Sequence, residues 1–209
     1  MMDFLDLFSA TDMIARWLHV IAGIAWIGHL YFFNLVNVPL QGVLDDAAKK
    51  AVNPKLLPRA LWWFRWGAMV TFLAGWVLFT MNYMYTPGLG FGPSVLFTDS
   101  DGMTGRAMWI MLGMLLGTIM WFNVWFVIWP AQKKMLSGQA LPEELPAIRK
   151  RAFLASRINI YLSGPMLFGM LAPAHFGVMS FGNFIVFMAV ALATVWWAIK
   201  ASAQAGQSV

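Results

Sequence analysis

Residues 17–36 read WLHVIAGIAWIGHLYFFNLV, twenty consecutive positions without a Lys, Arg, Asp or Glu. At 1.5 Å per residue, a helix of about 20 apolar residues crosses the ~30 Å hydrocarbon core of a bilayer. The rest of the chain has the same character, since 60% of its 209 residues are apolar and 11% are charged, against about 25% charged in a typical soluble domain. The mean hydropathy is +0.68. The sequence therefore predicts an integral membrane protein and excludes a soluble globular one.

Apolar stretches of this length recur along the chain, separated by polar, Pro-rich or Gly-rich segments. They predict an all-α bundle of about five transmembrane helices that forms a single domain over residues 1–209. Pro130 is expected to end the third helix, because proline lacks the backbone N–H that a continuing helix needs. A short surface helix is expected after Leu141. The predicted spans are 13–36, 61–83, 107–129, 158–175 and 181–199.

Basic residues lie mainly on one side of this predicted bundle. The connections 38–60 and 131–157 and the C-terminus share that side, which holds twelve of the fourteen Lys and Arg residues when Arg65 is included. Arg16 and Arg106 lie on the other side. Because Lys and Arg accumulate in cytoplasmic loops, the N-terminus is predicted outside and the C-terminus inside. This topology accounts for the net charge of +5, so we expect lipid contact in the bacterial inner (cytoplasmic) membrane and no nucleic-acid partner.

The chain contains no cysteine, which excludes disulfides, cysteine-ligated iron–sulfur clusters and covalently attached c-type haem within it. Three histidines, His19, His29 and His175, fall within or at the ends of predicted spans. An ionisable group is costly inside a membrane, and each of these residues is a functional candidate for that reason. By the predicted topology, His19 and His175 lie in the outer leaflet. His29 lies about 15 Å deeper than His19 along the same helix.

Two neutral imidazoles from different helices are what a six-coordinate b-type haem requires, since the iron takes one axial nitrogen on each face of the porphyrin. We therefore predict that His19 and His175 ligate a haem b. Arg16 and Arg106, the outer-side cations, are expected to pair with its propionates. Gly23, one turn beyond His19, would let a flat ring approach the backbone. Aromatic residues available as walls of this site are Phe168, Phe176, Trp17 and Trp26.

Other interpretations of these side chains stay open from the sequence. His19 and His175 are also compatible with hydrogen bonds between neighbouring helices. His29 has no other histidine or carboxylate at its depth, which favours a packed or hydrogen-bonded side chain. Arg65 and Arg157 lie at the inner ends of spans, where long cationic side chains extend toward the headgroups. No predicted span contains an acidic residue, so paired-carboxylate hydrolase chemistry is not expected.

Three stretches are more distinctive than the composition: WLHVIAGIAWIGHLYFFN from Trp17, WFNVWFVIWPAQKK from Trp121, and ASRINIYLSGPMLFGMLAPAHF from Ala155. Together they resemble the membrane N-terminal domain of the bacterial urate hydroxylases, the cytochrome c-coupled urate oxidase family. The resemblance covers nearly all of the chain. It gives weight to Trp17, His19, Gly23, Trp26, Gly28, Asn123, Trp125, Trp129, Pro130, Arg157, Asn159, Pro165 and His175.

The resemblance implies a b-haem-binding membrane oxidoreductase or electron-transfer protein of the urate hydroxylase type. In that family the membrane domain is usually followed by a cytochrome c domain, which receives the electrons of urate oxidation. This chain has no C-x-x-C-H motif, so its electron acceptor is expected to be a separate periplasmic c-type cytochrome. The alternative is a non-catalytic accessory subunit of a larger respiratory or photosynthetic membrane complex.

Overall fold

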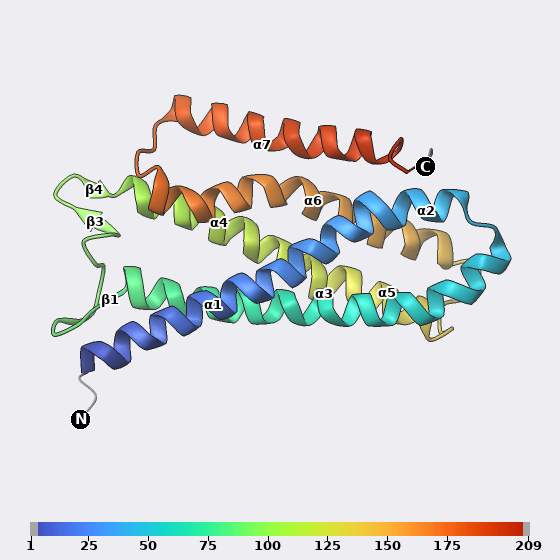
Figure 1. The fold of residues 1–209 in the computed structure, drawn as a ribbon, viewed down its shortest axis with the longest axis horizontal. Coiled ribbons are helices and arrows are strands. Elements are labelled where there is room, and N and C mark those ends of the chain that lie inside the picture. The colour runs from blue at the N-terminus through green and yellow to red at the C-terminus, as the bar shows by residue number, and fades with distance from the viewer. Residues whose placement is uncertain (1–3, 207–209) are drawn as a thin grey trace.

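The computed structural model describes residues 4–206 and is almost entirely helical (Figure 1). Two short antiparallel hairpins form in the connection that follows the second long helix, β1 (Tyr85–Thr86) with β2 (Gly90–Phe91) and β3 (Thr98–Asp99) with β4 (Gly102–Met103). The helical elements are α1 (Phe4–Tyr31), the π-helical η1 (Phe32–Asn37), α2 (Val38–Val43), α3 (Asp46–Tyr83), α4 (Gly105–Phe122), the π-helical η2 (Asn123–Ile128), α5 (Trp129–Leu136), α6 (Leu145–His175) and α7 (Phe181–Ser202).

The long helices run between two ends of the bundle that carry different residues (Figure 1). One end, here called the hairpin end, holds both β-hairpins and the start of α1. The other, here called the basic end, holds the α2–α3 and α5–α6 connections and the end of α7, where most of the Lys and Arg residues gather. The chain therefore begins at the hairpin end and finishes at the basic end.

The expected all-α membrane bundle is confirmed. Four helical stretches are long and apolar enough to cross a membrane: Leu7–Val43, Asp46–Tyr83, Gly105–Leu136 and Phe181–Ser202. The helix α6 has 31 residues and runs beside them between the same two ends (Figure 1). It is less apolar because its start is basic and because it packs inside the bundle, where it buries the polar side chains of Asn159 and Ser163.

The helices extend beyond the apolar stretches that predicted them. Residues 46–60, expected as part of a polar connection, form the first turns of α3, and the carboxylate of Asp45 caps this helix by accepting from the Ala48 N–H at 2.7 Å. The expected surface helix after Leu141 is continuous with α6. A capped helix continues in water or headgroups without apolar side chains, so hydropathy marks the membrane rather than the helix.

The third helix does not end at Pro130. It passes through the π-helical segment η2 into α5, where Pro130 occupies one of the first two positions, and it ends at Leu136. Proline is tolerated in a first turn because the N–H groups there lack an intrahelical acceptor. The change of helical register at η2 creates such a first turn inside one continuous helix.

Both π-helical segments contribute an asparagine that bonds to α6. Asn34 in η1 donates from Nδ2 to Ser156 Oγ at 2.9 Å and to its own Leu30 carbonyl at 3.0 Å. Asn123 in η2 donates to Asn159 Oδ1 at 2.8 Å. Isolated π turns commonly occur at functional sites. Here each π-helical segment places the side-chain amide of one asparagine within hydrogen-bond distance of α6.

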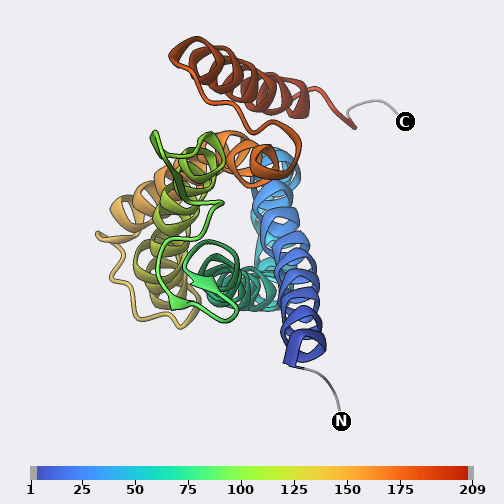
Figure 2. The same cartoon turned by 90° about the vertical axis from the view of Figure 1, so that its left-hand side faces the viewer.

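The bundle is built from two closely packed helix pairs, α1 with α3 and α4 with α6. Each pair meets at glycine, because a Cβ at Gly67 would lie 3.0 Å from the Trp26 nitrogen, and one at Gly113 would lie 3.0 Å from the Gly169 carbonyl carbon. Figure 2, which looks onto the hairpin end, shows α1 diverging there from α6. The main buried cluster lies toward the basic end and contains Trp26, Leu30, Leu61, Phe64, Ala68, Met120, Val124, Ile128, Ala155, Ile160, Met166 and Val195.

The last helix, α7, lies on the outside of the bundle against α6 (Figures 1 and 2). A Cβ at Gly164 of α6 would lie 2.9 Å from the Ala191 carbonyl, so the two backbones approach closely at this point. Val195 is the buried residue of α7. The other exposed side chains of α7 are mostly apolar and suit contact with lipid.

Candidate functional site

His19 is held by the backbone of the neighbouring helix. It lies in α1, partly buried, with Nδ1 2.9 Å from the Thr71 carbonyl oxygen of α3. A carbonyl oxygen accepts hydrogen bonds, so Nδ1 carries the proton and the lone pair of the neutral imidazole lies on Nε2. Metal-binding histidines use this arrangement, in which one ring nitrogen donates to a carbonyl and the other faces the metal. Gly75 leaves room for the ring, because a Cβ there would lie 3.1 Å from His19 Cε1.

His175 is the last residue of α6 and is exposed at the hairpin end. Within residues 4–206, its imidazole has no hydrogen-bond partner. His19 lies deeper, since its contacts Thr71 and Gly75 precede the end of α3 at Tyr83 by eight to twelve residues, or about 12–18 Å. Side chains lean toward the N-terminus of their helix. Because α1 and α6 run in opposite directions, the His19 side chain leans toward the hairpin end and the His175 side chain leans toward the basic end. This orientation reduces the difference in depth between the two imidazoles.

His29 uses its own helix as a partner. Its Nδ1 lies 2.6 Å from the Ala25 carbonyl oxygen, one turn earlier in α1. The expectation of a hydrogen-bonded histidine is confirmed. The side chain of His29 is part-buried.

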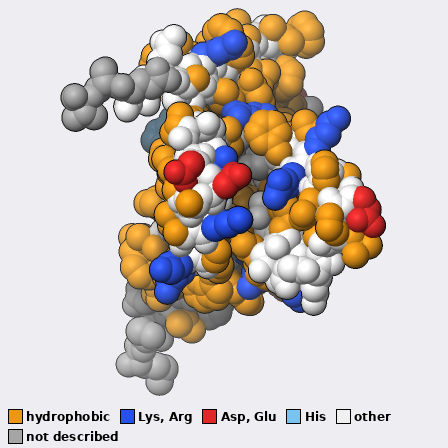
Figure 3. All heavy atoms as spheres, turned by 90° about the vertical axis from the view of Figure 1, so that its right-hand side faces the viewer, with side chains coloured by type: hydrophobic (Ala, Val, Ile, Leu, Met, Phe, Trp, Pro, Cys, Tyr) orange, Lys and Arg blue, Asp and Glu red, His pale blue; other side chains and the backbone are white. Residues whose placement is uncertain are grey.

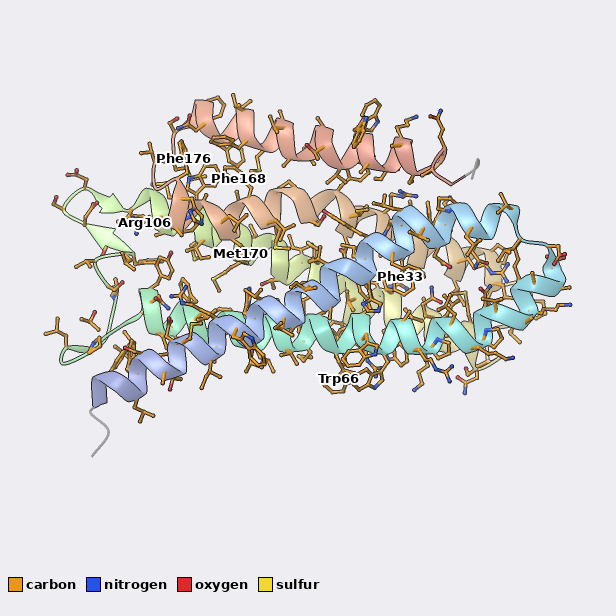
Figure 4. All side chains as sticks on the ribbon, in the orientation of Figure 1. Phe33, Trp66, Arg106, Phe168, Met170 and Phe176 are labelled. Carbon is orange, nitrogen blue, oxygen red and sulfur yellow. The ribbon has the colours of Figure 1, made fainter. Side chains whose placement is uncertain are left out.

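The expected propionate partners differ in what they contact. Arg16 forms an ion pair with Asp12 (2.5 Å) and also donates to the Asn82 side chain at 2.8 Å, so its charge is already compensated. Arg106 forms no ion pair within the described residues and is exposed at the start of α4, against Gly177. Arg106 is therefore the available cation of the hairpin end (Figure 4).

Among the remaining residues proposed for this site, Gly23 lies beside His19 and faces the same residue of α3, whereas the aromatic residues make other contacts. Gly23 faces α3, where a Cβ would lie 3.8 Å from the Thr71 methyl group. Phe168 stacks on Phe187 of α7 (4.4 Å between ring centroids), and Figure 4 shows Phe168 near Phe176 at the hairpin end. The other two aromatic residues are also placed elsewhere: Trp17 is 57% exposed and Trp26 is 2% exposed within the main cluster. These aromatic side chains do not gather around His19.

Sequence reasoning missed how Arg65 is held. Its guanidinium lies 3.9 Å from the Trp129 ring centroid and 5.2 Å from that of Trp125, and its buried Nε has no hydrogen-bond partner among the residues that the structure describes. The cation stacks on aromatic faces at the junction of α3 with η2 and α5. The spacing of Trp125 and Trp129, four residues apart, places both rings on one helix face. That spacing was the available signal.

Hydrogen bonds between side chains join α6 to the helices around it. Asn159 is fully buried and donates to the Met120 carbonyl at 3.0 Å, and the Tyr31 hydroxyl lies 3.0 Å from Ser163 Oγ. Buried polar groups are satisfied in this way because an unpaired polar group in an apolar interior is costly. No group of three or more His, Cys, Asp or Glu side chains suited to a metal ion occurs in the part of the chain that the structure describes.

A comparison with protein families matches most of this chain. The family model described as urate oxidase N-terminal matches residues 6–51 and 93–203, which is most of the chain. The matched ranges contain His19, His29 and His175, both π-helical segments and all of α6. Residues 52–92, which form most of α3 and the first hairpin, fall outside the match. No curated protein and no solved structure matches the chain.

Proposed function

The chain belongs to the urate oxidase N-terminal family, and we propose that it is a b-haem-binding membrane oxidoreductase or electron-transfer protein of the urate hydroxylase type. It is a multi-pass membrane protein related to the urate hydroxylases. In this role it acts in the bacterial inner membrane and passes electrons from substrate oxidation to a periplasmic c-type cytochrome. When bound, a haem supplies one-electron chemistry between substrate and acceptor.

The hydrogen bond between His19 Nδ1 and the Thr71 carbonyl carries this proposal. It fixes the tautomer and leaves Nε2 free, which is the state that an axial ligand needs. A histidine that only links the two helices would need no more than this hydrogen bond from Nδ1. Among residues 4–206, Nε2 of His19 has no hydrogen-bond partner, although the side chain is partly buried.

His175 is the proposed second ligand. It lies at the hairpin end, on a helix antiparallel to that of His19, and its imidazole has no hydrogen-bond partner in the described part of the chain. Arg106, two residues into α4, supplies an uncompensated positive charge at the same end for the haem propionates. Arg16 contributes less, because Asp12 already pairs with it.

The proposed acceptor is a periplasmic c-type cytochrome, and residues 1–209 contain no cysteine that could attach a c-type haem within them. Under the predicted topology, the hairpin end faces the periplasm, where soluble c-type cytochromes reside. A haem held by His19 and His175 would then lie on the side where its partner arrives.

The test is a pyridine haemochrome spectrum of the purified protein, followed by reduced-minus-oxidised spectra of single variants. His19→Ala and His175→Ala should each abolish the low-spin b-type spectrum. His29→Ala is the matched control and should keep it, because its imidazole bonds within its own helix. Loss of haem in the His29 variant alone would show that the wrong pair has been chosen.

The same preparation tests the alternative of an accessory subunit. A colourless protein that co-purifies with larger membrane subunits would support a non-catalytic role and contradict the haem proposal. A b-type spectrum in the isolated chain would support the oxidoreductase.

A further inference from the structure

An open groove of about 440 Å³ lies on the surface of the bundle, where η2 packs against the first turns of α6. Its lining residues on α6 recur every three or four positions and therefore share one helix face. The Asn123 amide at one wall already donates to Asn159 at 2.8 Å. The groove is lined by Asn123, Val127, Ala147, Lys150, Arg151, Leu154, Ala155 and Ile158.

The groove changes from charged to apolar along its length. Lys150 and Arg151 are exposed and lie toward the basic end, whereas Val127, Leu154 and Ile158 form an apolar wall on the side of the membrane interior. Leu154 is 47% exposed and Ile158 is 51% exposed. From Arg151 to Ile158 the helix rises about 10 Å. A phospholipid has the same order, with a charged headgroup followed by a hydrocarbon chain.

The two cations of the groove are uncompensated. Among residues 4–206, the side chains of Lys150 and Arg151 form neither an ion pair nor a hydrogen bond. The lining contains no acidic residue. Glu144, just before α6, is paired with Lys134 at 2.6 Å. A phosphate at this position would therefore receive charge-assisted hydrogen bonds from an ammonium and a guanidinium without competition from a carboxylate.

Charge, rather than apolar contact, selects the lipid at such a site. Lipid tails are as apolar as the side chains of the groove, so a chain gains little by leaving the surrounding bilayer. An anionic headgroup gains more, because Lys and Arg beside a membrane attract anionic lipids, and basic pockets between transmembrane helices bind their headgroups. Figure 3, which looks onto the basic end, shows Lys and Arg side chains distributed over it with apolar side chains between them.

We propose that this groove binds one anionic phospholipid. Its phosphate lies between Lys150 and Arg151, and one acyl chain lies along Val127, Leu154 and Ile158. The inference goes beyond the proposed function, because the site needs neither haem nor an oxidisable substrate. Under the predicted topology, the lipid belongs to the cytoplasmic leaflet.

The experiment is native mass spectrometry of the full chain in detergent, titrated with dioleoyl phosphatidylglycerol or with dioleoyl phosphatidylcholine. The protein should bind phosphatidylglycerol more tightly, because phosphatidylcholine offsets its phosphate with an ammonium group. The double variant Lys150→Gln/Arg151→Gln should raise the Kd for phosphatidylglycerol roughly 25-fold, about fivefold for each cation. Its Kd for phosphatidylcholine should stay unchanged.

The matched control is Lys49→Gln/Lys50→Gln. It removes the same charge from consecutive residues in the first turns of α3, at the same end of the bundle but outside the groove. Its Kd for phosphatidylglycerol should equal that of the unmodified protein. An equal loss in both double variants would overturn the proposal, because it would reveal attraction to the basic surface in general. Equal affinity of the unmodified protein for the two lipids would overturn it as well.

A second pair of variants tests the position of the lipid with every charge retained. Ala147→Phe places a ring beside the two cations on the same helix face and should weaken phosphatidylglycerol binding. Ala47→Phe, at an exposed position in the first turn of α3, should not. Unchanged binding in Ala147→Phe would exclude the groove as the site. Glycerol 3-phosphate, which has no acyl chain, should not displace the lipid, and displacement would identify a site for free phosphate instead.

Discussion

Replacement of Gly75 by alanine tests the role of His19 without touching the histidine. The added Cβ would lie 3.1 Å from His19 Cε1 and 3.3 Å from Nδ1, whereas carbon atoms pack at about 3.5–4.0 Å. The ring must therefore retreat by about 0.5 Å. Its bond to the Thr71 carbonyl, now 2.9 Å, would lengthen to about 3.4 Å, beyond the normal range. Losing such a support of a metal-binding histidine typically lowers metal affinity 10- to 100-fold.

The assay is titration of haem into haem-free protein, followed by the Soret band. Gly75→Ala should weaken haem binding within that range and leave the protein folded. Gly28→Ala is the control, because it also places alanine in a helix and no atom lies within 4 Å of the new Cβ. Unchanged haem affinity in Gly75→Ala would refute the argument that the Thr71 carbonyl prepares His19 as a ligand.

Three other predictions concern topology and stability. Since the chain has no cysteine, Asp99→Cys should react with an impermeant maleimide in intact cells and Lys133→Cys only after permeabilisation; the reverse would invert the topology. Asn159→Leu should lower unfolding stability in detergent by about 1–3 kcal/mol, because it removes two interhelical hydrogen bonds; no change would show that those bonds contribute nothing. The hydrogen bond from Lys134 holds the pKa of Glu144 below its usual value, so its stabilisation is present above about pH 4.3 and is lost as pH falls through the lowered pKa. Amide exchange at 137–144 should rise over that acid range, and Glu144→Gln should show the faster exchange already at pH 7.

The positions of the helices could be predicted because a membrane leaves the backbone few choices. Every N–H and C=O in the hydrocarbon must be bonded within the segment, so an apolar stretch such as 17–36 is a helix. Helix ends follow other rules. Asp45 begins α3 in the polar stretch before the predicted span, and η2 carries the third helix past Pro130. The N-cap at Asp45 and the change of helical register in η2 determine these ends. Neither feature is visible in the hydropathy of the sequence.

The contacts of the candidate site were harder to predict. The partner of His19 is a backbone carbonyl in α3, and any residue at position 71 would supply one. Arg65 was expected to reach the headgroups but stacks on Trp129. Its aromatic partners lie about sixty positions away in sequence, so only the packing of α3 on α5 brings them together. Residue type indicated candidates, whereas helix pairing determined their neighbours.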